Sequence, residues 1–162
     1  MIGVALLGAT GSIGASTLAV LRQHRDRFRL VAVAVRSNWE ALLPIIAEFG
    51  PQVCAIEDEQ AALSLSAAMS RHHPQVEVVA GRDAASIAAT CAGAQLVVAG
   101  VSGFAGLPST WAAVAAGKQV LLANKEALVA SGNLLLNMAR HPGARVLPID
   151  SEHTAAYQCA NG

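Results

Sequence analysis

The chain has 162 residues, the length of one ordinary domain, and 54% of them are hydrophobic while only 14% are charged. Eleven acidic residues balance eleven lysines and arginines, so the net charge gives no electrostatic reason to expect nucleic acid or an anionic membrane as a partner. The three cysteines, Cys54, Cys91 and Cys159, form no C-x-x-C pair, which argues against a disulfide framework or a thiolate zinc site and favours a reducing, cytoplasmic location.

Short β-branched runs alternate with longer stretches rich in alanine and leucine. We predict strands at residues 3–7, 30–35, 53–57, 76–79, 96–99, 119–122 and 145–148, and helices at 13–24, 38–49, 59–72, 82–90, 105–115 and 125–140. Strands that alternate with helices in this way are typical of βαβ units with right-handed crossovers. The sequence therefore predicts an α/β fold, a Rossmann-like, doubly wound, mostly parallel sheet of about seven strands with helices on both faces.

The sequence also bears on targeting segments and on the division into domains. The first seven residues have no basic stretch and no apolar run reaches the length of a membrane span, so we expect neither a signal peptide nor a membrane partner. Residues 152–158 resemble the opening of a further helix. We expect residues 1–149 to form a nucleotide-binding domain and residues 150–162 to be the truncated start of a catalytic, metal-binding domain.

The segment "LLGATGSIGAST" places three glycines between the first predicted strand and the first predicted helix. In that context Gly8 permits a tight turn, Gly11 lets the backbone approach a pyrophosphate, and Gly14 lets the helix pack closely. Thr10 and Ser12 add hydroxyl donors beside the free N–H groups of the helix start. The spacing is G-x-x-G-x-x-G rather than G-x-G-x-x-G. We favour a dinucleotide site, and a purely structural turn is the alternative.

The second predicted strand ends without the acidic residue that usually binds the ribose of NAD. Arg36 stands there instead, followed by Ser37 and Asn38. A guanidinium can pair with a 2′-phosphate, so the sequence favours NADP over NAD. The alternative is a solvated arginine on a loop.

Two later clusters follow the fifth and sixth predicted strands, where open α/β sheets bind ligands. "AGVSGFAGLPST" (99–110) could lie against the nicotinamide half of a cofactor or form a glycine-rich turn. "LLANKEALV" (121–129) inserts Asn124, Lys125 and Glu126 into apolar sequence. Such a junction can place the Lys125 ammonium in the same crevice as a cofactor. The alternative is a surface lysine that pairs with the neighbouring glutamate.

The last cluster, "LPIDSEH" (147–153), follows the seventh predicted strand. Asp150 and Glu152 are two residues apart, so in extended chain both point to one face. Two converging carboxylates suit Mg²⁺ or Mn²⁺, and Ser151 between them is a possible phosphate or hydroxyl donor. The alternative is an ordinary helix start with Ser151 as N-cap and Glu152 as a first-turn acid.

Three segments, "LLGATGSIGASTL", "GKQVLLANKEALV" and "LPIDSEHTAAYQC", closely resemble the 1-deoxy-D-xylulose 5-phosphate reductoisomerase family. These are NADPH- and metal-dependent enzymes of the methylerythritol phosphate route to isoprenoids. The resemblance covers the whole chain but only the N-terminal part of the family's protein. It implies NADPH, a divalent cation (Mg²⁺ or Mn²⁺, with Co²⁺ also suitable), a sugar phosphate substrate and a homodimer of the full-length protein.

The resemblance also implies roles for individual residues. Thr10, Gly11, Ser12 and Ile13 match the pyrophosphate-binding turn. The residues that match contacts of the 2′-phosphate and other parts of NADPH are Arg36, Ser37, Asn38, Asn124 and Glu126. Arg36 and Ser37 depart from the commoner Gly-Lys, which leaves open which of them reads the phosphate. Lys125 and Ser151 match substrate contacts, with Lys125 near the reacting oxygen, and Asp150 and Glu152 match two of three metal carboxylates.

Two other function classes fit the glycine turn. A reductase of the semialdehyde dehydrogenase type would need an activated cysteine at the cofactor, and neither Cys54 in a predicted strand nor Cys91 at a helix end suits that role. A non-catalytic nucleotide-binding module would have no use for Asp150 and Glu152 in one crevice with Lys125. We therefore expect a fragment of a reductoisomerase with little or no turnover by itself.

Overall fold

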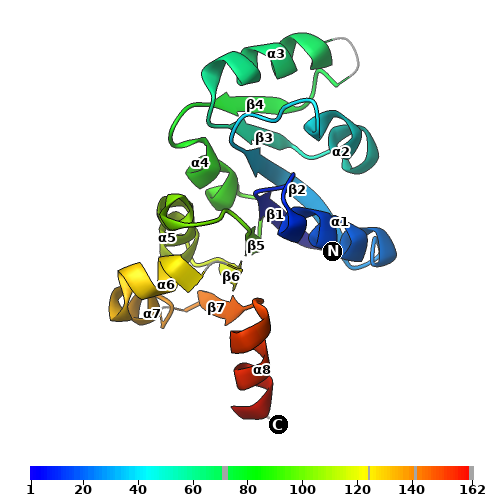
Figure 1. The fold of residues 1–162 in the computed structure, drawn as a ribbon. Coiled ribbons are helices and arrows are strands. Elements are labelled where there is room, and N and C mark those ends of the chain that lie inside the picture. The colour runs from blue at the N-terminus through cyan, green and yellow to red at the C-terminus, as the bar shows by residue number, and fades with distance from the viewer. Residues whose placement is uncertain (71–72, 124, 141, 161–162) are drawn as a thin grey trace.

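A computed structural model of the chain describes residues 1–70, 73–123, 125–140 and 142–160. Within these residues, the strands form one seven-stranded sheet in the spatial order β4-β3-β2-β1-β5-β6-β7, with parallel neighbours throughout (Figure 1). The strands are β1 (Ile2–Leu7), β2 (Phe28–Val35), β3 (Val53–Ile56), β4 (Glu77–Ala80), β5 (Leu96–Ala99), β6 (Gln119–Leu122) and β7 (Arg145–Pro148). The predicted α/β class is confirmed, and the sheet is parallel throughout rather than mostly parallel.

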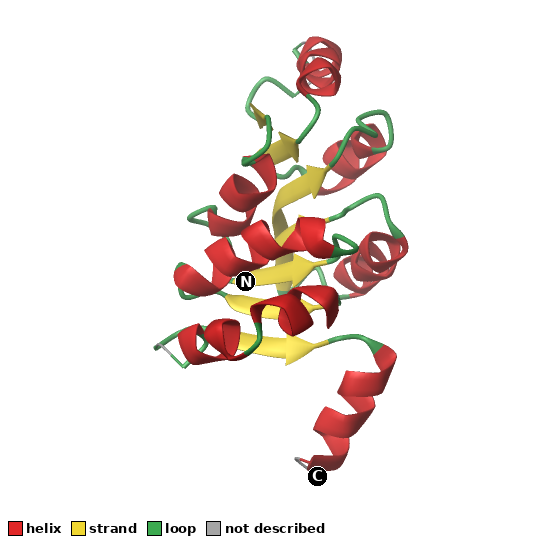
Figure 2. Cartoon of the chain, turned by 60° about the vertical axis from the view of Figure 1, so that its left-hand side comes forward, coloured by secondary structure: helices red, strands yellow, loops and turns green. Residues whose placement is uncertain are grey.

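Helices cover both faces of the sheet, and the last helix, α8, extends away from it (Figure 2). They are α1 (Ser12–Gln23), α2 (Leu42–Phe49), α3 (Glu59–Met69), α4 (Ala84–Thr90), α5 (Leu107–Ala115), α6 (Lys125–Ser131), α7 (Asn133–Met138) and α8 (Ser151–Ala160), with a 3₁₀ turn η1 (Phe104–Gly106) before α5. The predicted helix opening after residue 150 is confirmed by α8. None of the described helices has both the length and the apolar character needed to cross a bilayer.

Two predicted helices differ most from the structure. The helix expected at 38–49 begins only at Leu42, because the Asn38 side-chain oxygen accepts the Ala41 N–H at 3.3 Å and holds the preceding residues in a turn. The helix expected at 125–140 is divided into α6 and α7 at Gly132, whose φ of 53° lies in the left-handed region. Glycine adopts that conformation without a Cβ penalty, so it ends α6 there.

The sheet reverses its direction of growth between β1 and β5. Strands β2, β3 and β4 extend the sheet on one side of β1, and the chain then returns so that β5 pairs with β1 on the other side. Helices α1, α2 and α3 pack on one face, while α4, α5, α6 and α7 pack on the other. In such sheets the crevice for ligands opens at the carboxyl ends of the two strands where the order reverses.

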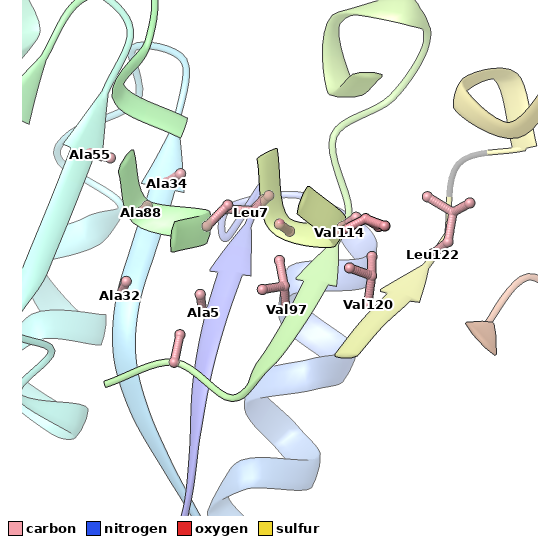
Figure 3. Close-up of a cluster of buried hydrophobic side chains, with 14 of the residues drawn as sticks. Ala5, Leu7, Ala32, Ala34, Ala55, Ala88, Val97, Val114, Val120 and Leu122 are labelled. Carbon is pink, nitrogen blue, oxygen red and sulfur yellow. The ribbon is translucent and has the colours of Figure 1, made fainter. Parts of the chain in front are cut away.

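Alternate residues of β1 supply the two halves of the core. Ala5 and Leu7 face the α4 side, and Val4 and Leu6 face the α1 side, all of them 1% exposed or less. Figure 3 shows the α4 side, where small side chains of β2 and β3 lie against Ala88. The alanine-rich stretch at 84–94 is therefore more than a helix-forming composition, since its buried alanines let α4 lie close to three strands as the chain crosses from β4 to β5.

This close packing predicts the effect of enlarging Ala88, which is fully buried. Ala88→Leu should lower the free energy of unfolding by about 1–3 kcal/mol, because three extra carbons have no space between α4 and the sheet. Ala67→Leu, at an exposed position of α3, should change it by less than about 0.5 kcal/mol. Urea unfolding of both variants measures the difference, and equal stabilities would contradict close packing at α4.

Candidate functional site

The glycine turn connects the carboxyl end of β1 to α1. The N–H groups of Gly8 and Ala9 both donate to the Ala34 carbonyl at the end of β2, at 2.8 and 3.1 Å. Gly8 has a φ of 77°, and a Cβ there would lie 2.7 Å from the Gly100 carbonyl oxygen. A Cβ at Gly14 would overlap the Ala9 carbonyl. These two glycines are thus required by backbone contacts within the chain.

Gly11 has a different environment. It is exposed, and the nearest atom to a Cβ there is the Gly8 carbonyl oxygen at 3.4 Å, an ordinary contact. Gly11 is also the N-cap of α1, and no side chain caps the helix there. Thr10 and Ser12 on either side are exposed as well. The start of α1 thus presents backbone N–H groups and two hydroxyls on an open surface, the arrangement that binds phosphate at helix N-termini.

The loop after β2 carries the three residues expected at the adenosine end. Arg36, Ser37 and Asn38 are exposed, and the Arg36 carbonyl accepts the Asp58 N–H at 2.9 Å, which ties the loop to the end of β3. Among the ion pairs of the described residues, none involves the Arg36 guanidinium. The Asn38 side-chain oxygen is used by Ala41, so its amide N–H₂ is the group that can donate outward.

A cleft of about 230 Å³ opens between the carboxyl ends of β1, β5, β6 and β7. Its lining residues are Ile13, Gly100, Val101, Ser102, Gly103, Ala123, Lys125, Glu126, Asp150 and Glu152. The volume is below that of typical small-molecule pockets, about 300–1,000 Å³. The cleft therefore has room for only part of a dinucleotide, and the adenosine-end residues of the β2 loop lie outside its lining.

Five residues predicted from sequence are brought together in this cleft: Ile13, Lys125, Glu126, Asp150 and Glu152. Asn124, predicted as a cofactor contact, lies outside the described residues. Ser151 is absent from the lining, and its hydroxyl donates to Glu152 Oε2 at 2.8 Å.

The sequence left open whether the segment 99–110 contacts a cofactor or only turns the chain, and it did not point to Ala123. The glycines of the 99–110 segment were the available signal, but glycine-rich turns are common in sequences of this kind. The structure places residues 100–103 along the cleft because the Gly100 N–H donates to the Leu7 carbonyl at 3.0 Å, beside the glycine turn.

The two carboxylates converge for a reason other than the predicted one. The chain is not extended from Asp150 to Glu152, because α8 begins at Ser151. Asp150, rather than Ser151, caps this helix, since its Oδ1 accepts the His153 N–H at 2.8 Å. The helix start then brings Glu152 to the same cleft as Asp150. The expectation of an extended pair is therefore wrong. The alternative, a helix start with Glu152 in its first turn, is confirmed, except that Asp150 and not Ser151 is the cap.

Hydrogen bonds lower the pKa of both carboxyl groups. The His153 backbone N–H lowers the pKa of Asp150, with smaller contributions from the His153 ring and the Lys125 charge. The His153 ring Nδ1 lies 2.8 and 2.9 Å from the two Asp150 oxygens. The Ser151 hydroxyl lowers the pKa of Glu152, and the Glu152 N–H and the Lys125 charge act in the same direction. Two anionic groups thus face one lysine in the cleft.

This donor set fits part of a divalent cation site. Carboxylate oxygens are the ligands that Mg²⁺ and Mn²⁺ prefer, and Asp150 and Glu152 present them side by side. The described residues contain no group of three or more histidines, cysteines or acids that could hold a metal ion. The described part of the chain therefore offers two carboxylate ligands, and a full coordination shell needs others.

None of the cysteines lies in the cleft lining. Cys54 is buried in β3, and burial raises the pKa of its thiol to about 12. Such a thiol is a poor nucleophile, because the thiolate is the reactive form. Cys91 follows α4, and Cys159 is on α8. This arrangement does not support the cysteine chemistry of a semialdehyde dehydrogenase.

The chain is similar in sequence to proteins of known family. Residues 4–132 match the family model of 1-deoxy-D-xylulose 5-phosphate reductoisomerase. The reductoisomerase of Tolumonas auensis is 44% identical over 154 residues, which cover 95% of this chain and 39% of that protein. A putative homoserine dehydrogenase from Archaeoglobus fulgidus, 20% identical with a TM-score of 0.57, shares the fold alone.

Solved structures give the same result. A crystal structure of DOX-P reductoisomerase in complex with NADPH, fosmidomycin and magnesium has a TM-score of 0.92 at 42% identity, over 98% of this chain and 39% of that one. The Zymomonas mobilis enzyme in complex with NADPH has a TM-score of 0.90 at 39% identity, over 98% and 41%. The chain thus spans about two fifths of the length of these relatives. It belongs to the 1-deoxy-D-xylulose 5-phosphate reductoisomerase family.

Proposed function

We propose that this chain is the NADPH-binding part of a reductoisomerase that converts 1-deoxy-D-xylulose 5-phosphate to 2-C-methyl-D-erythritol 4-phosphate. The observation that carries this proposal is the cleft, in which Lys125, Asp150 and Glu152 meet Ile13 of the glycine turn. A nucleotide-binding module without chemistry would have no use for this convergence. The crystallised relatives that contain NADPH and magnesium support the same choice of cofactors.

The cofactor is proposed to lie across the carboxyl edge of the sheet. The pyrophosphate would face the exposed start of α1, against Thr10, Gly11, Ser12 and Ile13, with the Thr10 and Ser12 hydroxyls and the N–H groups of the helix start as donors. The Gly11 N–H is used by the Gly8 carbonyl, so Gly11 would contribute the close approach of its backbone, while Gly8 and Gly14 shape the turn. The 2′-phosphate would face the Arg36 guanidinium, with Ser37 and the Asn38 amide beside it. Glu126 in the cleft and Asn124 before α6 complete the proposed contacts.

The substrate end of the site is proposed at β6 and β7. Asp150 and Glu152 would hold Mg²⁺ or Mn²⁺, and Ser151 would contact the substrate. When bound, the cation supplies a Lewis acid and NADPH supplies the hydride. Lys125 would place its ammonium next to the substrate oxygen that becomes negatively charged, which stabilises that charge most effectively where water is excluded.

Three parts of the proposal concern the complete enzyme and rest on the family and on the sequence pattern. The complete enzyme would be a homodimer, it would be cytoplasmic, and residues 150–162 would open its catalytic domain after a nucleotide-binding domain at 1–149. No feature of the described residues favours another function class, since the cysteines lie outside the cleft.

Replacing Arg36 tests the proposed 2′-phosphate contact. Arg36→Ala should weaken NADPH binding about tenfold to a hundredfold and leave NADH binding nearly unchanged, because a charge-assisted contact is worth about 1.5–3 kcal/mol. Fluorescence titration of the reduced nicotinamide measures both affinities. Arg29→Ala, exposed near the other end of β2, is the matched control. An unchanged ratio of the two affinities in Arg36→Ala would exclude Arg36 as the phosphate reader.

Neutralising Asp150 tests the proposed metal contact. Asp150→Asn keeps an oxygen that can cap α8 but removes a charge from the cation site, so Mn²⁺ affinity should fall about tenfold or more. Titration followed by electron paramagnetic resonance measures free Mn²⁺. Asp58→Asn changes a second capping aspartate, whose Oδ1 accepts the Ala61 N–H at 2.8 Å in α3, and should leave Mn²⁺ binding intact. Equal affinities in the two variants would contradict a role for Asp150.

Turnover tests how much of the reaction this chain can perform. The described residues supply two carboxylates to the cleft and contain no group of three or more side chains that could hold a metal ion, and the chain spans only about two fifths of the length of its relatives. We therefore expect the 162-residue chain to bind NADPH without oxidising it when substrate and Mg²⁺ are added. Absorbance at the reduced nicotinamide band measures this, and steady oxidation dependent on substrate would overturn the expectation.

A further inference from the structure

The helix that begins at the proposed metal site has few contacts with the rest of the molecule. Helix α8 extends from the end of β7 away from the sheet (Figure 1 and Figure 2). Every residue of α8 is exposed except Thr154, which is half-buried. The direction of α8, and with it the position of Glu152 in its first turn, thus depends on the few contacts at the junction with β7.

At this junction, the peptide unit between Pro148 and Ile149 is hydrogen-bonded to β6 on one side and to α8 on the other. The Ile149 N–H donates to the Leu122 carbonyl of β6 at 3.0 Å, which extends the sheet by one residue. The Pro148 carbonyl belongs to the same peptide unit, and because that unit is trans and planar the carbonyl points away from β6. It has a partner there, since the Thr154 hydroxyl donates to it at 3.1 Å.

Thr154 therefore makes two hydrogen bonds to the start of the segment that carries the carboxylates. Its hydroxyl reaches back to Pro148, and its N–H donates to the Asp150 carbonyl at 3.0 Å. Asp150 and Glu152, whose side chains line the cleft, lie between Pro148 and Thr154 in the chain. Removing the hydroxyl would leave the Pro148 carbonyl to water and would free α8 to tilt about its first turn, which moves Glu152 relative to Asp150.

We propose that Thr154 is a positioning residue that sets the separation of the Asp150 and Glu152 carboxylates through its hydroxyl bond to the Pro148 carbonyl. This inference rests on the proposed function, because it assigns Thr154 a part in the proposed cation site. Thr154 does not touch the cation or the substrate, and it acts through the backbone of the loop.

The test compares two substitutions of Thr154 in the 162-residue chain. Thr154→Val keeps the branched shape but lacks the donor, and Thr154→Ser keeps the donor. We expect Thr154→Val to raise the Mn²⁺ dissociation constant about twofold to tenfold, the equivalent of one net hydrogen bond, and Thr154→Ser to restore the wild-type value. Electron paramagnetic resonance of Mn²⁺ measures the constants. NADPH affinity should be the same in all variants.

A threonine of α4, outside the cleft lining, supplies the control. Thr90 ends α4, and its hydroxyl also donates to a backbone carbonyl, that of Ser86 at 2.9 Å. Thr90→Val should leave Mn²⁺ affinity unchanged. If Thr154→Val binds Mn²⁺ as tightly as wild type, or if Thr90→Val weakens binding equally, the positioning role is wrong.

Hydrogen exchange tests the arrangement in the absence of metal, so that the two proposals can fail separately. The His153 and Thr154 amides are both bonded to Asp150, and we expect both to exchange faster in Thr154→Val than in Thr154→Ser when followed by NMR. Equal exchange would overturn the positioning role. A wild-type chain that binds no Mn²⁺ would contradict the metal site of the proposed function, while the exchange rates would still decide the role of Thr154.

Discussion

The close approach of two backbone turns, one after β1 and one after β5, determines the ligand edge of this molecule. The Gly100 N–H bonds to the Leu7 carbonyl, and a Cβ at Gly8 would lie 2.7 Å from the Gly100 carbonyl oxygen. Since Gly14 also lets α1 begin directly over the turn, the start of the helix and the β5 turn share one edge. Larger side chains at these positions would force the turns apart and separate the phosphate-binding surface from the cleft.

That approach depends in turn on how the chain crosses the sheet. After β4 the chain must pass under three strands before β5 can pair with β1, and α4 makes this crossing. Its buried face consists of Ala84, Ala88 and Ala89, so the helix lies close to β1, β2 and β3. Protein interiors are packed to the density of organic crystals. The alanines therefore determine how closely α4 approaches the sheet, and with it the position at which β5 begins.

Much of this fold could be predicted from the sequence, because hydrophobic periodicity and the residues that end helices and strands are local features of the chain. Each of the seven strands was predicted within two residues at either end, since short buried runs were bounded by glycine, proline or polar residues. The loop at Asn38 and the break at Gly132 were missed because a side-chain bond and a left-handed residue outweighed a continuous helical pattern. Ser151 was considered as the cap of α8 only in the alternative interpretation, and Asp150 is the cap, because both residue types cap helices well and only the geometry distinguishes them.

Asp150 can cap α8 and contact the proposed cation at the same time. A carboxylate has about four acceptor positions, and the His153 N–H takes one of them on Oδ1. The His153 ring lies against both oxygens, so a cation at Asp150 would have to share or displace the ring but not the backbone N–H. The cap would therefore persist with the metal bound and keep the carboxylate plane fixed. Glu152, in the first turn of α8, accepts a hydrogen bond from the hydroxyl of Ser151, but Ser151 belongs to the same exposed helix. The position of Glu152 therefore depends on the junction that holds α8 to β7.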